Sequence, residues 1–332
     1  MRVQIIHENG TPDVFQAGQL DRPVPGVGQV LVRVGASSVN TADLMARSMG
    51  PVVNFIPTPP AVLGMDFAGT VVALGPGVDQ FAVGDEVFGC AGGVAHHQGT
   101  LAEYLAADVR LIAQKPARLT MVEAAALPLV AITAYEALFD RVHLKAGQKV
   151  LVHGGAGGVG HVAIQLAVAA GAEVFATDSG AERLATITRL GATAIDYKTD
   201  KVADYVARYT DGQGFDVVFD TVGGPNLPTA FEGARLNGAV ATTVSIGAID
   251  LTMAHLRGVS LHVVYMLIPM IHDHGAGRHG EILEELASLV DAGKVAPVVD
   301  SVYPLDAAAD AHRKLESKSA IGKVVVQVEA QA

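Results

Sequence analysis

The sequence has one cysteine and no long apolar run, and each shortage excludes a class of protein. Cys90 alone cannot form an intrachain disulfide or build a cysteine-rich zinc lobe. No apolar run reaches the ~18 residues that a membrane-spanning helix requires. The opening residues, MRVQIIHENG, also lack the apolar core of a signal peptide. We therefore expect a cytoplasmic protein in a reducing compartment, with no membrane partner.

Charged residues are also few, at 17% of the chain, whereas 50% of the residues are hydrophobic. Much of the chain should therefore lie in a core or a subunit interface. The net charge of −11 argues against a nucleic-acid partner. A length of 332 residues exceeds that of an average domain, so we expect two domains.

The chain divides into two regions with different sequence patterns. The first third reads as mainly β, because short β-branched runs are separated by Gly and Pro. From residue 148 strands alternate with helices, as in a doubly wound parallel sheet. The expected strands are 3–6, 30–34, 67–74, 86–88, 149–152, 173–177, 194–197, 216–219, 239–244, 261–266 and 323–328; the expected helices are 124–138 (after a Thr120/Glu123 capping box), 162–170, 179–190 and 281–290.

The most informative stretch runs from Gly147 to Gln165 and contains G-x-G-x-x-G at Gly155, Gly157 and Gly160. A buried strand precedes these glycines and an Ala-rich helix follows them. In this setting the first glycine permits a tight turn, the second lets the backbone approach a pyrophosphate, and the third lets helix pack on strand. The helix N-terminus then offers N–H groups to phosphates. The pattern predicts a dinucleotide-binding site.

Asp178 closes the next expected strand, ~20 residues after the glycines, where a carboxylate accepts hydrogen bonds from an adenosine ribose. An alternative is that Asp178 caps the following helix.

Together these motifs resemble the zinc-independent medium-chain dehydrogenases/reductases, in the quinone oxidoreductase (zeta-crystallin-like) branch. Gly147, Leu151, 155–158, Gly160 and Gln165 follow the signature of that branch, from which Val168 departs. Residues 60–89 match the N-terminal pattern of the family. Smaller matches are Asn40 with Asp43, 127–134, 220–224 and 322–325.

The resemblance implies an α/β protein in which a Rossmann doubly wound parallel sheet is joined to a GroES-like, mainly β catalytic domain. The implied domains are residues 1–120 (catalytic), 121–266 (nucleotide-binding) and 267–332 (returning to the catalytic domain). The family is usually homodimeric. An apolar last Rossmann strand at the sheet edge could pair with its copy in a partner, unless a loop or helix covers it.

We expect no metal. Zinc-dependent relatives carry a Gly-His-Glu motif and a second cysteine, whereas this chain has Gly64-Met65-Asp66 and only Cys90. The histidines at 96–97 and at 272, 274 and 279 lack the spacing of zinc ligands, so we interpret them as loop residues.

Site residues follow from the resemblance, each beside a structural alternative. Asn40 resembles a residue near the nicotinamide and substrate, or forms an Asx-turn. Thr133 resembles a residue beside the nicotinamide, or bonds to its own helix. Met45 stands where relatives often have tyrosine; with Tyr265 and Met266 it lines the expected substrate pocket, or belongs to the core. The expected cofactor contacts are Gly155, Gly157, Gly158, Val159, Gly160, Asp178, Arg183, Tyr197, Val222, Ser245 and Lys318.

The choice between NADH and NADPH stays open. Asp178 would repel a 2′-phosphate and favours NADH. The branch mostly uses NADPH, and Arg183, Tyr197 and Lys318 match positions that surround the phosphate in relatives, although cations are also common on surfaces.

Without zinc, the reaction must be one in which a hydride adds to an electrophilic conjugated system and a hydrogen-bond donor stabilises the resulting charge. The sequence therefore predicts NAD(P)H-dependent reduction of a quinone or an α,β-unsaturated carbonyl (enone). The alternatives are an enoyl-thioester reductase and a non-catalytic, nucleotide-binding redox sensor.

Overall fold

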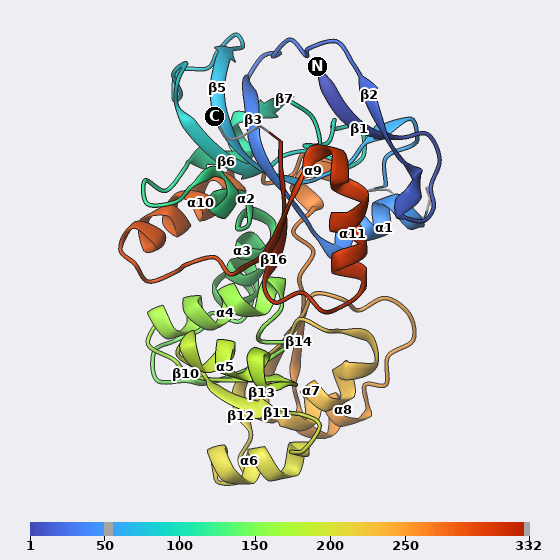
Figure 1. The fold of residues 1–332 in the computed structure, drawn as a ribbon. Helices are drawn as coiled ribbons and strands as arrows, with labels where there is room; N and C mark the ends of the chain where they lie inside the picture. Colours follow the sequence, from blue (N-terminus) through green and yellow to red (C-terminus); the bar gives the residue numbers. More distant parts are fainter. Residues whose placement is uncertain (50–55, 329–332) are drawn as a thin grey trace. The chain divides into compact units, whose positions relative to one another are not determined.

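The computed structural model describes residues 1–49 and 56–328, which divide into two compact units (Figure 1). Unit 1 comprises Met1–Ile132, Leu267–Gly293 and Pro297–Ala332, and unit 2 comprises Thr133–Met266 and Lys294–Ala296. The sequence placed the boundaries after residues 120 and 266, whereas the chain passes between units after Ile132 and after Met266.

Unit 2 is built on a six-stranded sheet of order β11-β10-β9-β12-β13-β14 in which every pair is parallel. This is the doubly wound order that the strand–helix alternation predicts, so the expected Rossmann domain is confirmed. Its elements are β9 (Lys149–His153), α4 (Gly158–Ala169), β10 (Glu173–Asp178), α5 (Ala181–Arg189), β11 (Thr193–Asp196), α6 (Val202–Thr210), β12 (Phe215–Asp220), α7 (Leu227–Gly233), β13 (Ala234–Thr242), α8 (Thr252–Arg257) and β14 (Ser260–Val263).

The core of unit 2 explains the apolar runs of these strands. Val150, Leu151 and Val152 of β9 are all fully buried, because helices and neighbouring strands cover the central strand. The ring of Phe175 on β10 packs 5.2 Å, centroid to centroid, from that of Phe215 on β12. Burial of such rings contributes ~2 kcal/mol or more each, which helps to stabilise the sheet.

Unit 1 contains a three-stranded sheet of order β2-β1-β4 and a seven-stranded sheet of order β15-β16-β3-β5-β6-β8, in which β7 also pairs with β3. The GroES-like, mainly β domain is thereby confirmed. Its elements are β1 (Arg2–Ile6), β2 (Phe15–Gln19), β3 (Gln29–Val39), α1 (Thr41–Ser48), β4 (Ala61–Val62), β5 (Asp66–Leu74), β6 (Glu86–Cys90), β7 (Tyr104–Asp108), β8 (Ile112–Gln114), α2 (Met121–Ala125), α9 (Ile268–His272), α10 (Gly277–Asp291), β15 (Val299–Pro304), α11 (Ala308–Glu316) and β16 (Lys323–Gln327).

Strand β16 joins the end of the chain to its first third. It pairs antiparallel with β3, with Val324 opposite Val39 and Gln327 opposite Ala36. Its valines 324–326 are fully buried. The short β tail that the sequence predicts thus becomes an interior strand, because a strand of five residues gains burial only within a larger sheet.

The helix expected over 124–138 is interrupted. The Thr120/Glu123 capping box is present and starts α2, but that helix ends at Ala125. A second helix, α3 (Pro128–Tyr135), then begins at Pro128 and continues as a π-helical turn, Glu136–Arg141. Proline has no N–H to donate within a helix, although it fits the first turn, so Pro128 separates the two helices.

Some strands differ from expectation. The strand expected over 261–266 ends at Val263, so Tyr265 and Met266 follow the strand instead of lying in it. Strands β2, β4, β7, β8 and β15 were not expected. Among the described residues, no helix is both long enough and apolar enough to cross a membrane.

Gln165, the last residue of the glycine signature, has a structural role in unit 2. Its side-chain Nε2 donates to Ala296 O at 2.9 Å, and Ala296 N donates to Gln165 Oε1 at 2.8 Å. These paired hydrogen bonds fix the short segment Lys294–Ala296 against α4. The signature therefore includes a glutamine because an amide satisfies both backbone groups at once.

Candidate active site

The glycine turn of unit 2 has the geometry of a close strand–helix junction. A Cβ on Gly160 would lie 2.1 Å from Gly154 O, and one on Gly155 would lie 2.6 Å from the Cβ of Ala176. Both positions therefore require glycine for close packing. The positive φ of 72° falls on Gly154, so Gly154 makes the tight turn that the sequence assigned to Gly155.

Helix α4 begins at the same turn, with Gly157 as its N-cap. The N–H groups of its first residues, Gly158, Val159 and Gly160, have no partner within the helix. They form the positive end of a helix of 12 residues. The turn therefore fits an anion such as a pyrophosphate.

Asp178 lies at the end of β10 and is bonded to the glycine turn. Its Oδ2 accepts a hydrogen bond from Ala156 N at 3.1 Å, and its Oδ1 accepts one from Ser179 N at 2.9 Å. The following helix α5 has Gly180 as its N-cap, so the alternative that Asp178 caps this helix is wrong. Each Asp178 oxygen can accept further bonds, which leaves the carboxylate able to hold a ribose diol.

Three polar residues gather around Asp178. The Arg183 guanidinium lies 3.6 Å from its Oδ2, and Ser179 Oγ donates to Tyr197 Oη at 3.3 Å. Tyr197 N also donates to Asp178 O. The structure thus brings together Asp178, Arg183 and Tyr197 as expected, whereas Lys318 belongs to unit 1, between α11 and β16.

Val222 and Ser245 follow the carboxyl ends of β12 and β13, at the same edge of the sheet as the glycine turn. Val222 is 54% exposed, and its N–H donates to Asp220 Oδ1 at 3.0 Å. Loops at this edge are the usual ligand site of a doubly wound sheet.

A row of buried polar side chains below this edge was not expected. Thr177, His153, Asp220 and Thr242 occupy matching positions on adjacent strands. His153 Nδ1 lies 2.9 Å from Thr177 Oγ1, and burial lowers the pKa of His153 to about 4 although Asp220 opposes the shift. A histidine in the apolar run 150–153 was the signal that could have revealed this row.

In unit 1, Asn40 lies between β3 and α1 at the centre of a buried polar cluster, the Asn40 cluster, formed by Asn40, Asp43, Asp66 and Lys323. Asn40 N donates to Asp43 Oδ2 at 2.8 Å, as in a capping box. Asn40 Nδ2 donates to Asp66 Oδ2 at 2.8 Å, while Lys323 Nζ donates to Asn40 Oδ1. The Asn40 side chain therefore reaches two other strands.

Asp66 and Lys323 complete the cluster from β5 and β16. Asp66 also accepts from Ser38 Oγ and Leu129 N, both at 2.8 Å. Lys323 Nζ donates to Val39 O at 3.0 Å and lies 3.7 Å from Asp66 Oδ2. The sequence contained both residues only as matches to family patterns, without a role.

The cluster is almost completely buried, and burial changes its proton equilibria. Exposure is 0% for Asp66, 1% for Asp43 and 2% for Lys323. Burial raises the pKa of Asp43 to about 7, with Asp66 adding to the rise and Lys323 opposing it. Burial lowers the pKa of Lys323, against the pull of both carboxylates. Burial also raises the pKa of the Cys90 thiol, opposite Asp66 on β6.

The remaining expected site residues are divided between the units. Met45 is half-buried on α1 in unit 1. Thr133, the first residue of unit 2, is buried within α3. Tyr265 is 39% exposed and Met266 is buried, both at the end of unit 2.

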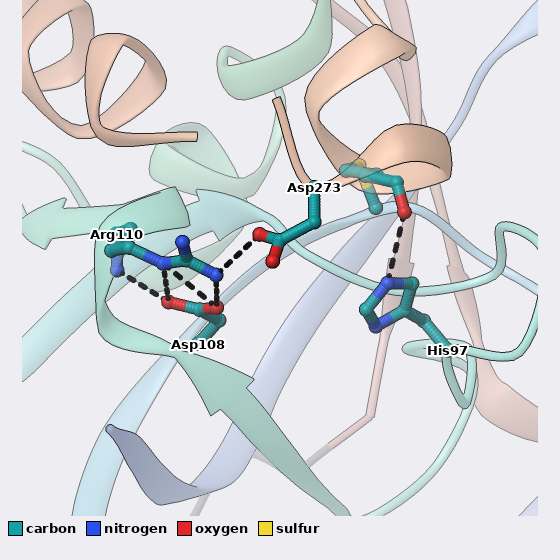
Figure 2. Close-up of polar contacts among 5 residues, drawn as sticks. His97, Asp108, Arg110 and Asp273 are labelled. Atoms are coloured by element: carbon teal, nitrogen blue, oxygen red, sulfur yellow. Dashed lines mark hydrogen bonds and ion pairs between the residues drawn. The ribbon is translucent and has the colours of Figure 1, made fainter. Parts of the chain in front are cut away.

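The histidines make structural contacts in unit 1. His97 Nε2 lies 3.1 Å from Met270 O of α9 (Figure 2). In the same region the Arg110 guanidinium bridges two carboxylates, with its Nη2 2.7 Å from Asp108 Oδ2 and 2.7 Å from Asp273 Oδ1. His96 stacks on His97. The interpretation of these histidines as loop residues is wrong for His272, the last residue of α9, and for His279, which is buried in α10. Within residues 1–49 and 56–328, no three His, Cys, Asp or Glu side chains form a group that could hold a metal ion.

The raised pKa of Asp43 predicts a pH-dependent stability. Between its ordinary pKa of 3.8 and about 7, the folded protein binds more protons than the unfolded chain, so stability falls as pH rises through this window. Asp43→Asn retains an acceptor for Asn40 N–H but cannot ionise. We expect the stability of wild type relative to Asp43→Asn to fall by up to ~4 kcal/mol across the window, measured by urea unfolding. Exposed Asp21→Asn is the control, and parallel pH profiles of wild type and Asp43→Asn would contradict the expectation.

Comparison with known proteins matches both units. A family model described as "Alcohol dehydrogenase GroES-like domain" matches residues 26–117, and one described as "Zinc-binding dehydrogenase" matches residues 190–326. The chain is 35% identical, over 90% of its length, to the spectinabilin polyketide synthase system protein NorB of Streptomyces orinoci, but spans only 13% of that protein. It is also 32% identical to the synaptic vesicle membrane protein VAT-1 homolog of rat, covering 92% of this chain and 78% of the relative.

Solved structures agree over the whole chain. An alcohol dehydrogenase superfamily protein from Novosphingobium aromaticivorans is 42% identical with a TM-score of 0.94, covering 99% of this chain and all of that one. An NAD-dependent alcohol dehydrogenase is 31% identical with a TM-score of 0.87. An Escherichia coli quinone oxidoreductase complexed with NADPH is 25% identical, also with a TM-score of 0.87. Each of these two matches covers 99% of this chain and 100% of the solved structure. With its GroES-like unit, its Rossmann unit and its glycine signature, the chain belongs to the medium-chain dehydrogenase/reductase family, in the quinone oxidoreductase branch.

Proposed function

We propose that this oxidoreductase reduces quinones or α,β-unsaturated carbonyls with a nicotinamide cofactor and without zinc. The observation that carries the proposal is the glycine turn of unit 2, where the start of α4 and the Asp178 carboxylate lie together. When bound, the cofactor supplies the hydride; the protein supplies the binding and the charge stabilisation.

Cofactor binding assigns separate tasks to residues of unit 2. The first N–H groups of α4 would hold the pyrophosphate, because Gly157 at the N-cap has no side chain to block close approach, whereas Gly160 serves the packing of helix on strand. Asp178 would accept hydrogen bonds from the adenosine ribose, with Arg183 beside it. Because a 2′-phosphate would meet the Asp178 carboxylate, the site favours NADH over NADPH.

Unit 1 supplies the group that would stabilise the acceptor. Reduction of a conjugated carbonyl places negative charge on its oxygen, and a fixed hydrogen-bond donor lowers the energy of that charge. Asn40 carries such a donor in its carboxamide, whose position is fixed by Asp66 and Lys323. The final proton would come from solvent or from a cofactor ribose hydroxyl.

The donor set of unit 1 does not fit a catalytic zinc, which takes about three ligands of Cys, His or carboxylate type. Met65, in a Gly-Met-Asp sequence, stands where zinc-dependent relatives have histidine. The carboxylate of Asp66 is engaged by Ser38, Asn40 and Leu129, and its nearby cation is the Lys323 ammonium. This arrangement supports the proposal of zinc-independent chemistry.

A second candidate, reduction of an enoyl thioester, is favoured by one comparison. Two relatives of 32–35% identity are described as polyketide synthase proteins, of which the chain spans 13–15%. An enoyl thioester is also a conjugated carbonyl, so the same donor would serve it. The two candidates differ in the acceptor, which is a quinone or an enone in the first and an enoyl thioester in the second.

We also propose a homodimer through β14. This strand lies at the end of the six-stranded sheet and pairs with β13. Val263 on β14 is 50% exposed and Tyr265 beyond it is 39% exposed. An apolar edge strand of this kind can pair with its own copy about a twofold axis, which buries the same surface in both subunits.

Oxidation of NADH and NADPH, measured by absorbance with 1,4-benzoquinone, naphthoquinones, short enones and a crotonyl thioester, tests the activity. We expect turnover with quinones and enones. Turnover of the thioester alone would replace the first candidate by the second. Cofactor binding without turnover of any acceptor would favour a nucleotide-binding redox sensor.

Asp178→Ser tests the cofactor preference. Removing the carboxylate abolishes its repulsion of a 2′-phosphate, so the ratio of kcat/KM for NADPH to that for NADH should rise ~10-fold or more. Exposed Asp211→Ser, also in unit 2, is the control. An unchanged ratio would remove Asp178 from this role.

Val263→Lys tests the dimer. A charge on each copy of the edge strand should separate the subunits, because like charges would meet across the twofold axis. Light scattering after size-exclusion chromatography should show a dimer for wild type and for the control Val27→Lys, and a monomer for Val263→Lys. A monomeric wild type would contradict the proposal.

A further inference from the structure

The Asn40 carboxamide is held from both ends by opposite charges, which suggests more than a structural contact. Lys323 Nζ donates to its Oδ1, and its Nδ2 donates to Asp66 Oδ2 at 2.8 Å. We propose that Lys323 is a positioning residue that polarises Asn40, so that Asn40 acts as a hydrogen-bond donor to the acceptor oxygen. This inference rests on the proposed reduction of conjugated carbonyls.

The two charges fix the orientation of the carboxamide. Rotating it by half a turn would place the amide N–H groups against the Lys323 ammonium and the amide oxygen against the Asp66 carboxylate. Both contacts would be repulsive, so only one orientation is stable. In that orientation Oδ1 is occupied by Lys323 and one N–H by Asp66, and among the described residues the second N–H of Nδ2 has no further hydrogen-bond partner.

The charge of Lys323 strengthens this second N–H. A cation at an amide oxygen draws electrons from the nitrogen and makes its protons better donors. The effect is large only where water does not screen it, and Lys323 and Asp66 are 2% and 0% exposed. Asn40 is also buried, at 4% exposure, so the contacts of its carboxamide with Lys323 and Asp66 are little screened.

The contacts of Lys323 require its charged form. Its Nζ faces Val39 O at 3.0 Å, Asn40 Oδ1 and Asp66 Oδ2 at 3.7 Å. All three are acceptors, and an ammonium has three N–H groups to direct at them, whereas a neutral amine would turn a lone pair toward one of them.

The pairing of β16 with β3 brings Lys323 to this place. Val324, the next residue, lies opposite Val39, the residue before Asn40. The lysine position is therefore set by the main-chain pairing of β16 with β3.

Lys323→Met tests the polarisation with two classes of acceptor. An enone gains a localised, basic oxyanion, whereas a quinone spreads the charge over its ring, so the enone depends more on the donor. We expect kcat for enones to fall ~10-fold or more, kcat for quinones to fall ~3-fold or less, and the cofactor Kd to stay unchanged. Lys115→Met, which removes another largely buried lysine of unit 1, is the control.

A double-mutant cycle separates this role from a structural one. If Lys323 acts through Asn40, Lys323→Met adds no loss of enone kcat in an Asn40→Ala background. Additive losses, or equal losses for enones and quinones, would overturn the proposal. If Lys323→Met does not fold, Lys323→Gln, which keeps a donor but no charge, replaces it in every measurement.

Nuclear magnetic resonance of the Asn40 side-chain amide gives a readout without activity. The Nδ2 protons, assigned by their loss in Asn40→Ala, should move upfield in the Lys323 variant and not in Lys115→Met. An unchanged shift would overturn the polarisation. A wild type that reduces no acceptor but shows the shift would refute the proposed function and leave the polarisation standing.

Discussion

The buried charge of Lys323 is the constraint on which unit 1 depends. An ammonium without partners would cost several kcal/mol in such a place, and so would the carboxylate of Asp66. Each is stabilised by the other and by neutral groups: Val39 O and the carboxamide of Asn40 for the lysine, Ser38 and Leu129 for the aspartate. Removing one member would leave the opposite charge uncompensated, so the Asn40 cluster is held as a whole.

Unit 2 has a different task, because it must bind a large anionic cofactor although it has little positive charge of its own. Main-chain N–H groups at the start of α4 take the place of basic side chains, which suits a chain of net charge −11. Asp178 lies beside this turn and is bonded to it through Ala156 N. The carboxylate therefore helps to shape the turn, in addition to the ribose contact that we propose for it.

Much of unit 2 was predictable because its signals are local. The glycines, the strand before them and Asp178 lie close together in the sequence, and the strands of unit 2 have clear apolar runs, although helices α6, α7 and α8 were not among the expected helices. The tight turn at Gly154 was not predictable, since neighbouring glycines look alike until φ is known. The helix break at Pro128 could have been predicted, because proline cannot donate a hydrogen bond within a helix. The apolar pattern continues on both sides of Pro128, however, and led to the prediction of a single helix.

The Asn40 cluster was less predictable, because its members meet only through strand pairings between distant residues. Asn40 stood out by its resemblance to a family residue, whereas Asp66 and Lys323 looked like ordinary pattern matches. No local sequence pattern predicts that Lys323 lies beside Val39. The His153–Asp220 row was missed for the same reason, since its residues come together only when β9 and β12 pair in register.

The return of β16 to β3 also has a consequence for synthesis. On the ribosome, unit 2 emerges almost as one uninterrupted segment and can fold from contacts between neighbours in the chain, whereas the large sheet of unit 1 stays open until its last interior strand appears. Until then Asp43 and Asp66 lack Lys323 as a neighbouring cation and would remain hydrated. Completion of unit 1 therefore waits for nearly the whole chain, and a truncated product would lack both a strand and a charge.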